Sequence, residues 1–222
     1  MTRPPAAPGA AGPGAYVLGV DSGGSGLRVA LGRVELPGPL ATTLCAEPVR
    51  TGPGGIDATH LLDQLLPAAR ELLDRASASA TDDAPTGEVA ALAVGAAGMA
   101  TLGDRLRSEL PGALTEALGV RRLALAADAV TAYAGAVGQR PGAVVAGGTG
   151  MIALGTDLME WHRADGWGHL LGDSGGGAWI GRAGLDAAMR AHDGRRGGSP
   201  ALLDRLRSVF GPAEALPGLL YP

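Results

Sequence analysis

Lysine and asparagine are absent from this chain of 222 residues, and all 18 of its basic side chains are arginine. A Walker-type phosphate loop uses a lysine to contact the β- and γ-phosphates of a nucleotide, so that kind of nucleotide site is excluded. Schiff-base catalysis also requires a lysine amine and is excluded with it.

Cysteine, net charge and long apolar runs are scarce as well. The single cysteine, Cys45, excludes an internal disulfide framework and fits the reducing cytosol. A net charge of −4 gives no reason to expect nucleic acid or an anionic membrane surface as a partner. No apolar run approaches the length that crosses a bilayer. We therefore expect a cytoplasmic protein with neither a nucleic-acid nor a membrane partner.

Aromatic residues are also few, yet two of the three tryptophans lie in one glycine-rich segment, residues 165–181. Seven glycines and two aspartates share this segment. Such a cluster usually marks backbone with φ > 0 or backbone that passes close to a ligand. Aspartate and indole beside that backbone suit a small, hydroxyl-rich ligand. The alternative is an effect of composition, because 38 residues of the chain are glycine.

The pattern of apolar residues predicts two sets of strands and helices after a disordered tail, residues 1–15. In the first set we expect strands at residues 16–20, 27–31, 40–49, 89–94 and 123–127, and helices at 60–75, 105–118 and 129–137. Pro67 predicts a kink or an early start, and Pro111 a possible break. In the second set we expect strands at 143–146 and 151–154, helices at 178–191 and about 199–210, and no regular structure at 211–222. This alternation favours an α/β fold with domains at residues 16–138 and 139–222.

Two glycine-rich turns, residues 21–26 and 147–150, each join two strand patterns. A dinucleotide fingerprint would have to open a helix, whereas strand alternation follows the first turn. The amides of such hairpin turns can form an anion-binding nest. A single glycine turn is usually only a turn, but two in equivalent places can hold a triphosphate from both sides.

Two aspartates follow predicted strands. Asp21 lies where a strand meets the first turn, a position that suits a water-mediated Mg²⁺ contact. Asp128 lies between a strand and a helix, at the edge where parallel α/β sheets bind ligands. A carboxylate there can accept the proton of an attacking hydroxyl. Helix N-capping is the alternative role of Asp128, and the two roles can coexist.

The motifs VDSGGSG (20–26), AADA (126–129), AGGTG (146–150) and GWGHLLGD (166–173) resemble, in order and spacing, the BadF/BadG/BcrA/BcrD-type ATPase family. Within that family they look most like N-acetylglucosamine kinases. The resemblance covers about residues 16–192 and implies the sugar kinase/Hsp70/actin superfamily. It implies two ribonuclease-H-like domains, each a mixed sheet flanked by helices, that close on ATP. The superfamily's adenine motif and closing helix normally lie beyond residue 222, so an incomplete second domain is expected.

The resemblance also implies roles for individual residues. Asp128 would be the base that deprotonates the sugar 6-hydroxyl, and Asp21 would lie near Mg²⁺. The implied set around ATP is Asp21, Gly23, Gly24, Ser25, Gly148, Thr149 and Gly150, with Ser25 in the place of a usual threonine. The implied sugar-binding set is Gly166, Trp167, Gly168 and Asp173. ATP and Mg²⁺ are therefore the expected cofactors, a sugar is the expected substrate, and a homodimer is the expected assembly.

Two features limit what the resemblance implies. The family usually holds the sugar with an asparagine after the third strand. Residues 52–56, which correspond to that position, contain no asparagine, so the resemblance does not specify which sugar is bound. Relatives that activate dehydratases bind an iron–sulfur cluster through several cysteine thiolates. That role is excluded here, because Cys45 is the only cysteine of the chain. Three hypotheses remain: an ATP-dependent sugar kinase, a non-catalytic ATP or sugar sensor, and an ATPase that drives a partner protein.

Overall fold

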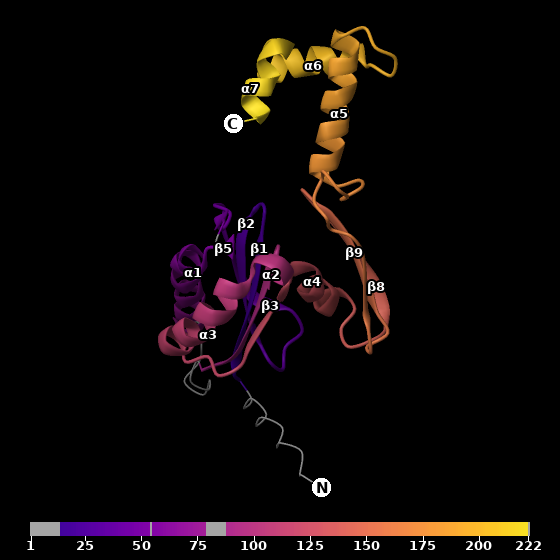
Figure 1. Cartoon of the computed structure of the whole chain (residues 1–222). Coiled ribbons are helices and arrows are strands. Elements are labelled where there is room, and N and C mark those ends of the chain that lie inside the picture. The colour runs from indigo at the N-terminus through magenta and orange to yellow at the C-terminus, as the bar shows by residue number, and fades with distance from the viewer. Residues whose placement is uncertain (1–13, 54, 79–87, 222) are drawn as a thin grey trace. The chain divides into compact units, whose positions relative to one another are not determined.

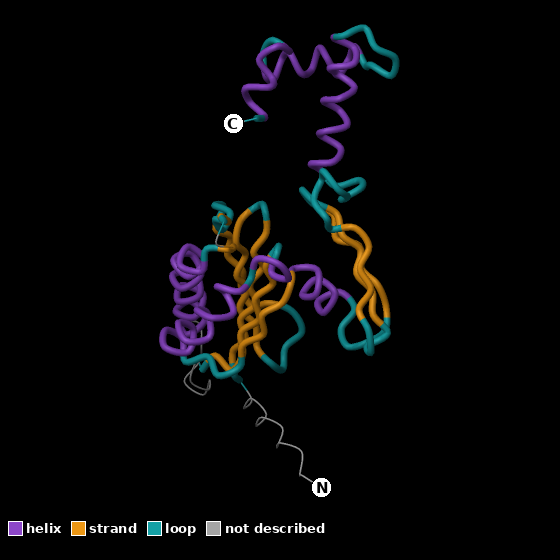
Figure 2. The backbone as a smooth tube through the Cα atoms, viewed as in Figure 1, coloured by secondary structure: helices purple, strands orange, loops and turns teal. Residues whose placement is uncertain are grey.

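The computed structural model describes residues 14–53, 55–78 and 88–221, and Figure 1 and Figure 2 show their course. The chain divides between Gly138 and Gln139 into two compact units, called here the first and the second unit. The expected tail at residues 1–15 lies outside the described residues except for its last two positions. Most of the polar loop between the first helix and the next strand, residues 79–87, also lies outside them.

The first unit is built on a five-stranded mixed sheet in the order β3-β2-β1-β6-β7. The strands β1 (Tyr16–Gly23), β2 (Gly26–Arg33) and β3 (Pro39–Cys45) pair antiparallel. The strands β6 (Val89–Ala96) and β7 (Leu123–Ala127) run parallel to β1. The carboxyl ends of β1, β6 and β7 therefore meet at one edge of the sheet, called here the carboxyl edge.

Alternation along the strands gives this sheet two different faces, and the main core lies on one of them. In β1 the side chains of Tyr16, Leu18 and Val20 are buried, whereas Asp21 belongs to the opposite face. The helices α1 (Ala58–Ala78) and α3 (Asp104–Leu118) contribute the other half of the core (Figure 1). Their fully buried leucines recur at helical spacing: Leu61, Leu65 and Leu72 in α1, and Leu106, Leu110 and Leu114 in α3. Burial of each such side chain stabilises the unit by about 1.5–3 kcal/mol.

Helix α4 (Asp128–Ala136) contacts β1, β6 and β7, on the face to which Asp21 belongs. A glycine allows this close approach, because a Cβ atom at Gly95 would overlap the side chain of Thr131. The short helix α2 (Met99–Leu102) follows β6 and contacts β7. The first turn of α4 is thereby held at the carboxyl edge.

The second unit contains a three-stranded antiparallel sheet in the order β10-β9-β8. Its strands are β8 (Gly142–Gly147), β9 (Met151–Thr156) and β10 (Trp161–Asp165). The helices are α5 (Gly177–His192), α6 (Pro200–Phe210), η1 (Ala213–Ala215) and α7 (Leu216–Leu220). The Ser199 hydroxyl caps α6 by accepting from the backbone N–H of Leu202 at 3.4 Å. This confirms the helix start predicted from Ser199 and Pro200.

Several sequence-based expectations differ from the structure. Pro111 lies inside α3 without splitting it, because this helix buries leucines on both sides of the proline. Pro67 lies inside α1, where the predicted kink stays a prediction. The third strand ends at Cys45 rather than at residue 49. The prediction of no regular structure at residues 211–222 is wrong, because η1 and α7 form there. Ala213 of η1 and Leu216 of α7 are buried in a small core with residues of α6.

The sequence patterns also missed α2, β10 and the two-residue strands β4 (Thr51–Gly52) and β5 (Gly55–Ile56). Within residues 14–53, 55–78 and 88–221, the helices are all too short or too polar to cross a membrane.

Candidate functional site

The first glycine turn leaves its tip open to solvent. Gly24 and Ser25 are exposed between the paired residues Gly23 and Gly26. Gly26 has φ 128°, and a Cβ atom there would overlap the carbonyl oxygen of Cys45. Gly26 therefore closes the turn structurally, while Gly24 and Ser25 are accessible to a ligand.

Asp21 is the carboxylate beside this turn. Its side chain is 60% exposed, and Oδ2 lies 3.9 Å from Nη1 of Arg28 on the neighbouring strand. An ion pair that is long and exposed stabilises little, so the carboxylate can still bind a cation. Mg²⁺ keeps most of its water and needs few protein carboxylates, so an exposed Asp21 fits such an ion. Among the described residues there is no group of three or more His, Cys, Asp or Glu side chains that could hold a metal ion.

Asp128 is the first residue of α4 and is half-buried. Its Oδ1 accepts the backbone N–H of Ala129 at 2.8 Å, and its carbonyl oxygen accepts the Thr131 hydroxyl at 2.9 Å. No described residue bonds to Oδ2 of Asp128. The carboxylate is thus oriented by one oxygen and can accept a proton on the other.

The sheet brings Asp21 and Asp128 to the same edge. Asp21 pairs with Gly95 of β6, and Gly95 pairs with Ala126 of β7, two residues before Asp128. The two strands β1 and β7 are separated by two strand spacings, about 10 Å. Two carboxylates on strands this close, at one edge of a sheet, are near enough to act on one ligand.

In the second unit the other glycine turn is packed against the segment 165–177. Gly148 donates its N–H to the carbonyl oxygen of Gly150 at 2.9 Å, and Thr149 is exposed at the tip. The N–H of Gly177 donates to the carbonyl oxygen of Gly148 at 2.8 Å. A Cβ atom at Gly150 would lie 2.6 Å from Oδ2 of Asp173. The residues predicted for phosphate and those predicted for sugar are therefore neighbours within this unit.

Asp165, which the sequence analysis did not select, organises the segment. Its carboxylate accepts the backbone N–H of Ser174 at 2.9 Å and also that of Asp173. These two hydrogen bonds, with that of Ser174 contributing most, hold the pKa of Asp165 below its usual range. Asp165 has φ 66°, a left-handed conformation that aspartate tolerates better than most residues. An aspartate before Gly-Trp-Gly was the one sequence signal for this role.

The four predicted sugar residues differ in their surroundings. Asp173 is 7% exposed, and its Oδ1 accepts the N–H of Gly168 at 3.0 Å. Gly166 donates to the carbonyl oxygen of Met151 at 2.8 Å and packs against Ile152. Trp167 is 61% exposed, and the Arg163 guanidinium lies 3.7 Å from its ring centroid. Gly166, Trp167 and Gly168 are thus exposed, whereas Asp173 is buried and holds the segment through the N–H of Gly168.

A hollow of about 640 Å³ lies elsewhere in the first unit. It is lined by the first half of β1, the middle of β6, the start of β7 and the arginines before β7, and includes Val17, Ala93 and Arg122. None of the predicted site residues lines it. Its apolar sheet face therefore does not belong to the candidate site.

Comparison with known proteins finds related sequences and folds. A family model described as the BadF/BadG/BcrA/BcrD ATPase family matches residues 18–216. An N-acetylmuramic acid/N-acetylglucosamine kinase from Clostridium acetobutylicum is 28% identical over 182 residues, which are 81% of this chain and 55% of that protein. The chain thus spans about half the length of this curated relative.

Two solved structures share the fold. A putative N-acetylglucosamine kinase from Chromobacterium violaceum has 30% identity and a TM-score of 0.57, covering 91% of this chain and 67% of that one. A putative N-acetylglucosamine kinase from Porphyromonas gingivalis has 21% identity and a TM-score of 0.60, covering 91% of this chain and 71% of that one. The predicted α/β fold class is confirmed, with a mixed sheet flanked by helices in the first unit. The expected mixed sheet of the second domain is not found among the described residues, where the three strands of the second unit all pair antiparallel.

Proposed function

The chain belongs to the BadF/BadG/BcrA/BcrD ATPase family, and we propose that it transfers the γ-phosphoryl group of ATP to the 6-hydroxyl of a sugar or amino sugar. One observation carries the proposal: Asp128 stands at the carboxyl edge with one carboxylate oxygen held by backbone and the other without a partner among the described residues. The names of the similar proteins, which are amino-sugar kinases, support the same chemistry.

In this proposal the first unit supplies the acid–base groups. Oδ2 of Asp128 accepts the proton of the sugar hydroxyl as the hydroxyl oxygen attacks the γ-phosphorus. Asp21 would hold Mg²⁺ through water, and the ion would supply positive charge beside the phosphates when bound. The exposed turn of Gly24 and Ser25 contributes backbone amides to the phosphates.

The second unit supplies the remaining contacts. Thr149 and the neighbouring turn amides bind phosphate oxygens, and the segment around Trp167 and Gly168 contacts the sugar. Asp173 can serve the sugar through its hold on the N–H of Gly168. We also propose a homodimer in the cytoplasm, which sedimentation of the purified protein and fractionation of its cells will test.

Release of ADP in the presence of a panel of sugars tests the proposed function. Asp128→Asn is expected to lower kcat by roughly 10²–10⁴-fold, since a general base contributes about that much, while sugar affinity is retained. Asp104→Asn is the matched control, because Asp104 also begins a helix of the first unit and its side chain is 99% exposed. Its kcat should stay within about twofold of the unsubstituted chain.

The other two hypotheses predict different outcomes. ADP release that needs no sugar and is unaffected by Asp128→Asn would contradict a sugar kinase. Turnover stimulated by a protein and indifferent to sugars supports a partner-driven ATPase. Binding of ATP and sugar without any turnover supports a sensor.

A further inference from the structure

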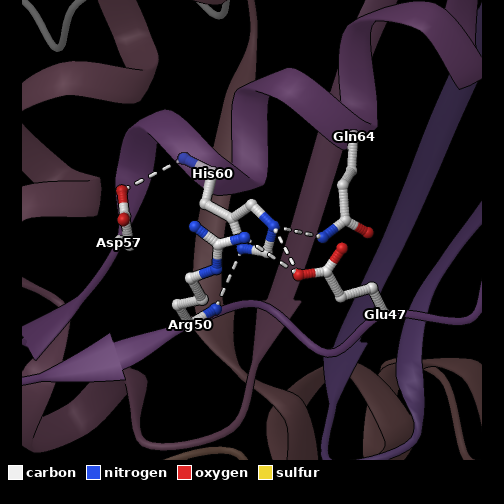
Figure 3. A network of polar contacts seen from close by, with 5 residues as sticks. All are labelled: Glu47, Arg50, Asp57, His60 and Gln64. Carbon is white, nitrogen blue, oxygen red and sulfur yellow. Dashed lines mark hydrogen bonds and ion pairs between the residues drawn. The ribbon is translucent and has the colours of Figure 1, made fainter.

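A cluster of polar side chains around His60 lies outside the residues considered so far (Figure 3). His60 lies in the first turn of α1, and its side chain is only 11% exposed. Its ring contacts three residues: the backbone N–H of Arg50, the carboxylate of Glu47 and the amide of Gln64. The ring thus joins α1 to the loop that follows β3.

The hydrogen bonds of the ring determine where its proton resides. Nδ1 accepts the N–H of Arg50 at 3.1 Å, so the neutral ring carries its proton on Nε2. Nε2 lies 3.3 Å from Oε1 of Glu47 and can donate to it. Nε2 also lies 3.3 Å from Nε2 of Gln64, while Oε1 of Gln64 is buried without a partner. Half a turn of that amide presents Oε1 of Gln64 as an acceptor to the ring N–H.

The hydrogen bond from the N–H of Arg50 to His60 lies at the base of the β4–β5 hairpin. The carbonyl oxygen of Arg50 accepts the N–H of Asp57 at 2.9 Å, and Thr51 pairs with Ile56 directly above. Asp57 in turn accepts the backbone N–H of His60 at 3.1 Å, which holds the pKa of Asp57 below its usual range. Residues 50–53 and 55–60 are therefore linked by hydrogen bonds on both sides of the hairpin, with the imidazole at its base.

The hairpin lies at the carboxyl edge. A Cβ atom at Gly55 would overlap or crowd the carbonyl group of Leu102 in α2, so the hairpin backbone packs directly on that helix. Helix α2 contacts β7, which leads into Asp128. Thr51, Gly52 and Pro53 are exposed at this edge. The hairpin and Asp128 are therefore linked through α2 and β7 at the same edge of the sheet.

We propose that His60 is a positioning residue for the phosphoryl acceptor: by binding the N–H of Arg50 it fixes the β4–β5 hairpin beside Asp128, and sugar affinity depends on it. This inference rests on the proposed sugar kinase function. The hairpin offers exposed backbone rather than charged side chains to a sugar, so its contribution depends on where the backbone is held.

Two substitutions separate the two sides of the ring. Asn at position 60 places an amide oxygen near the position of Nδ1 and keeps an acceptor for Arg50, whereas Gln reaches toward the position of Nε2 and loses it. His60→Gln is expected to raise KM for the sugar about tenfold, the loss of one positioned hydrogen bond, with kcat and KM for ATP within about twofold. His60→Asn should stay within about threefold for all three parameters.

A control and a second measurement keep the outcomes distinct. Thr115→Val removes the hydrogen bonds that this side chain of α3 donates to the carbonyl oxygens of Pro111 and Val120, and so matches a general loss of stability without touching the hairpin. Hydrogen exchange of the Asp57 amide, which donates to the carbonyl oxygen of Arg50, should quicken in His60→Gln and not in His60→Asn or Thr115→Val. Unchanged exchange, or faster exchange with an unchanged KM for the sugar, overturns the proposal.

If the unsubstituted chain phosphorylates no sugar, the proposed function fails. Hydrogen exchange then still decides whether His60 anchors the hairpin.

Discussion

The two units hold their candidate residues by different forces. Among the described residues, one apolar core of 22 buried side chains supports the first unit, whereas the core of the second unit has five. In the second unit Val145, Met159 and Leu171 are at least 70% exposed. Its glycine turn and its Trp167 segment are held by the hydrogen bonds of Asp165 and Asp173 and by close glycine contacts. Apolar burial thus positions Asp128, while polar contacts position Thr149 and Trp167.

The largest expected effect comes from the core of the first unit. Leu61→Ala should lower the free energy of unfolding of that unit by about 2–5 kcal/mol, because the fully buried side chain leaves a cavity. All three tryptophans lie in the second unit, so tryptophan fluorescence reports the unfolding of that unit alone. The unfolding midpoint measured by far-UV circular dichroism should therefore move to a lower denaturant concentration, while the midpoint measured by fluorescence stays unchanged. Leu44→Ala, at a side chain 58% exposed, is the control and should cost about 0.5 kcal/mol or less. Equal shifts of both signals would mean that the units unfold together.

The two glycine turns should respond unequally to alanine. Gly26→Ala combines an unfavourable φ of 128° with an overlap at Cys45 and should cost about 1–3 kcal/mol. Gly148→Ala meets no atom within 4 Å and should cost about 0.5 kcal/mol or less. Chemical denaturation of both variants measures the difference. A larger cost at Gly148 would show that the second turn is the more constrained one.

Acid should loosen the second unit locally through Asp165. Its pKa in the folded chain is lowered, so the ionised carboxylate stabilises the segment above its ordinary pKa of 3.8, and this stabilisation is lost as pH falls through the folded value. With Trp161 and Trp179 replaced by Phe, the fluorescence of Trp167 should stay constant from neutral pH to about pH 4 and shift to the red below it. Asp165→Ala should show the red-shifted emission at every pH.

Asp157 provides the matched acid for that experiment. The N–H groups of Glu160 and Met159 also lower its pKa, but it lies in the turn between β9 and β10. Asp157→Ala should leave the midpoint of the Trp167 signal in place. A moved midpoint would assign the acid transition to the turn instead of to Asp165.

Much of the first unit was predictable because its elements are long and bury one face. The leucine spacing at residues 61, 65 and 72 predicts a helix that the structure confirms, and the alternation of Leu27, Val29 and Leu31 predicts β2. The hairpin of β4 and β5 was missed because strands of two residues carry no periodicity. Helix α7 was missed because the burial of Leu216, and not its local sequence of proline and glycine, decides its conformation.

The sequence by itself determined the family, the α/β class and the place of Asp128 between a strand and a helix. These follow from motif order, apolar period and turn composition, which are local along the chain. Only the tertiary structure decided that Asp165 binds the N–H of Ser174, that Gly150 leaves room for Asp173, and that His60 holds Arg50. Each of these contacts joins residues many positions apart, through backbone angles and packing that no local pattern specifies.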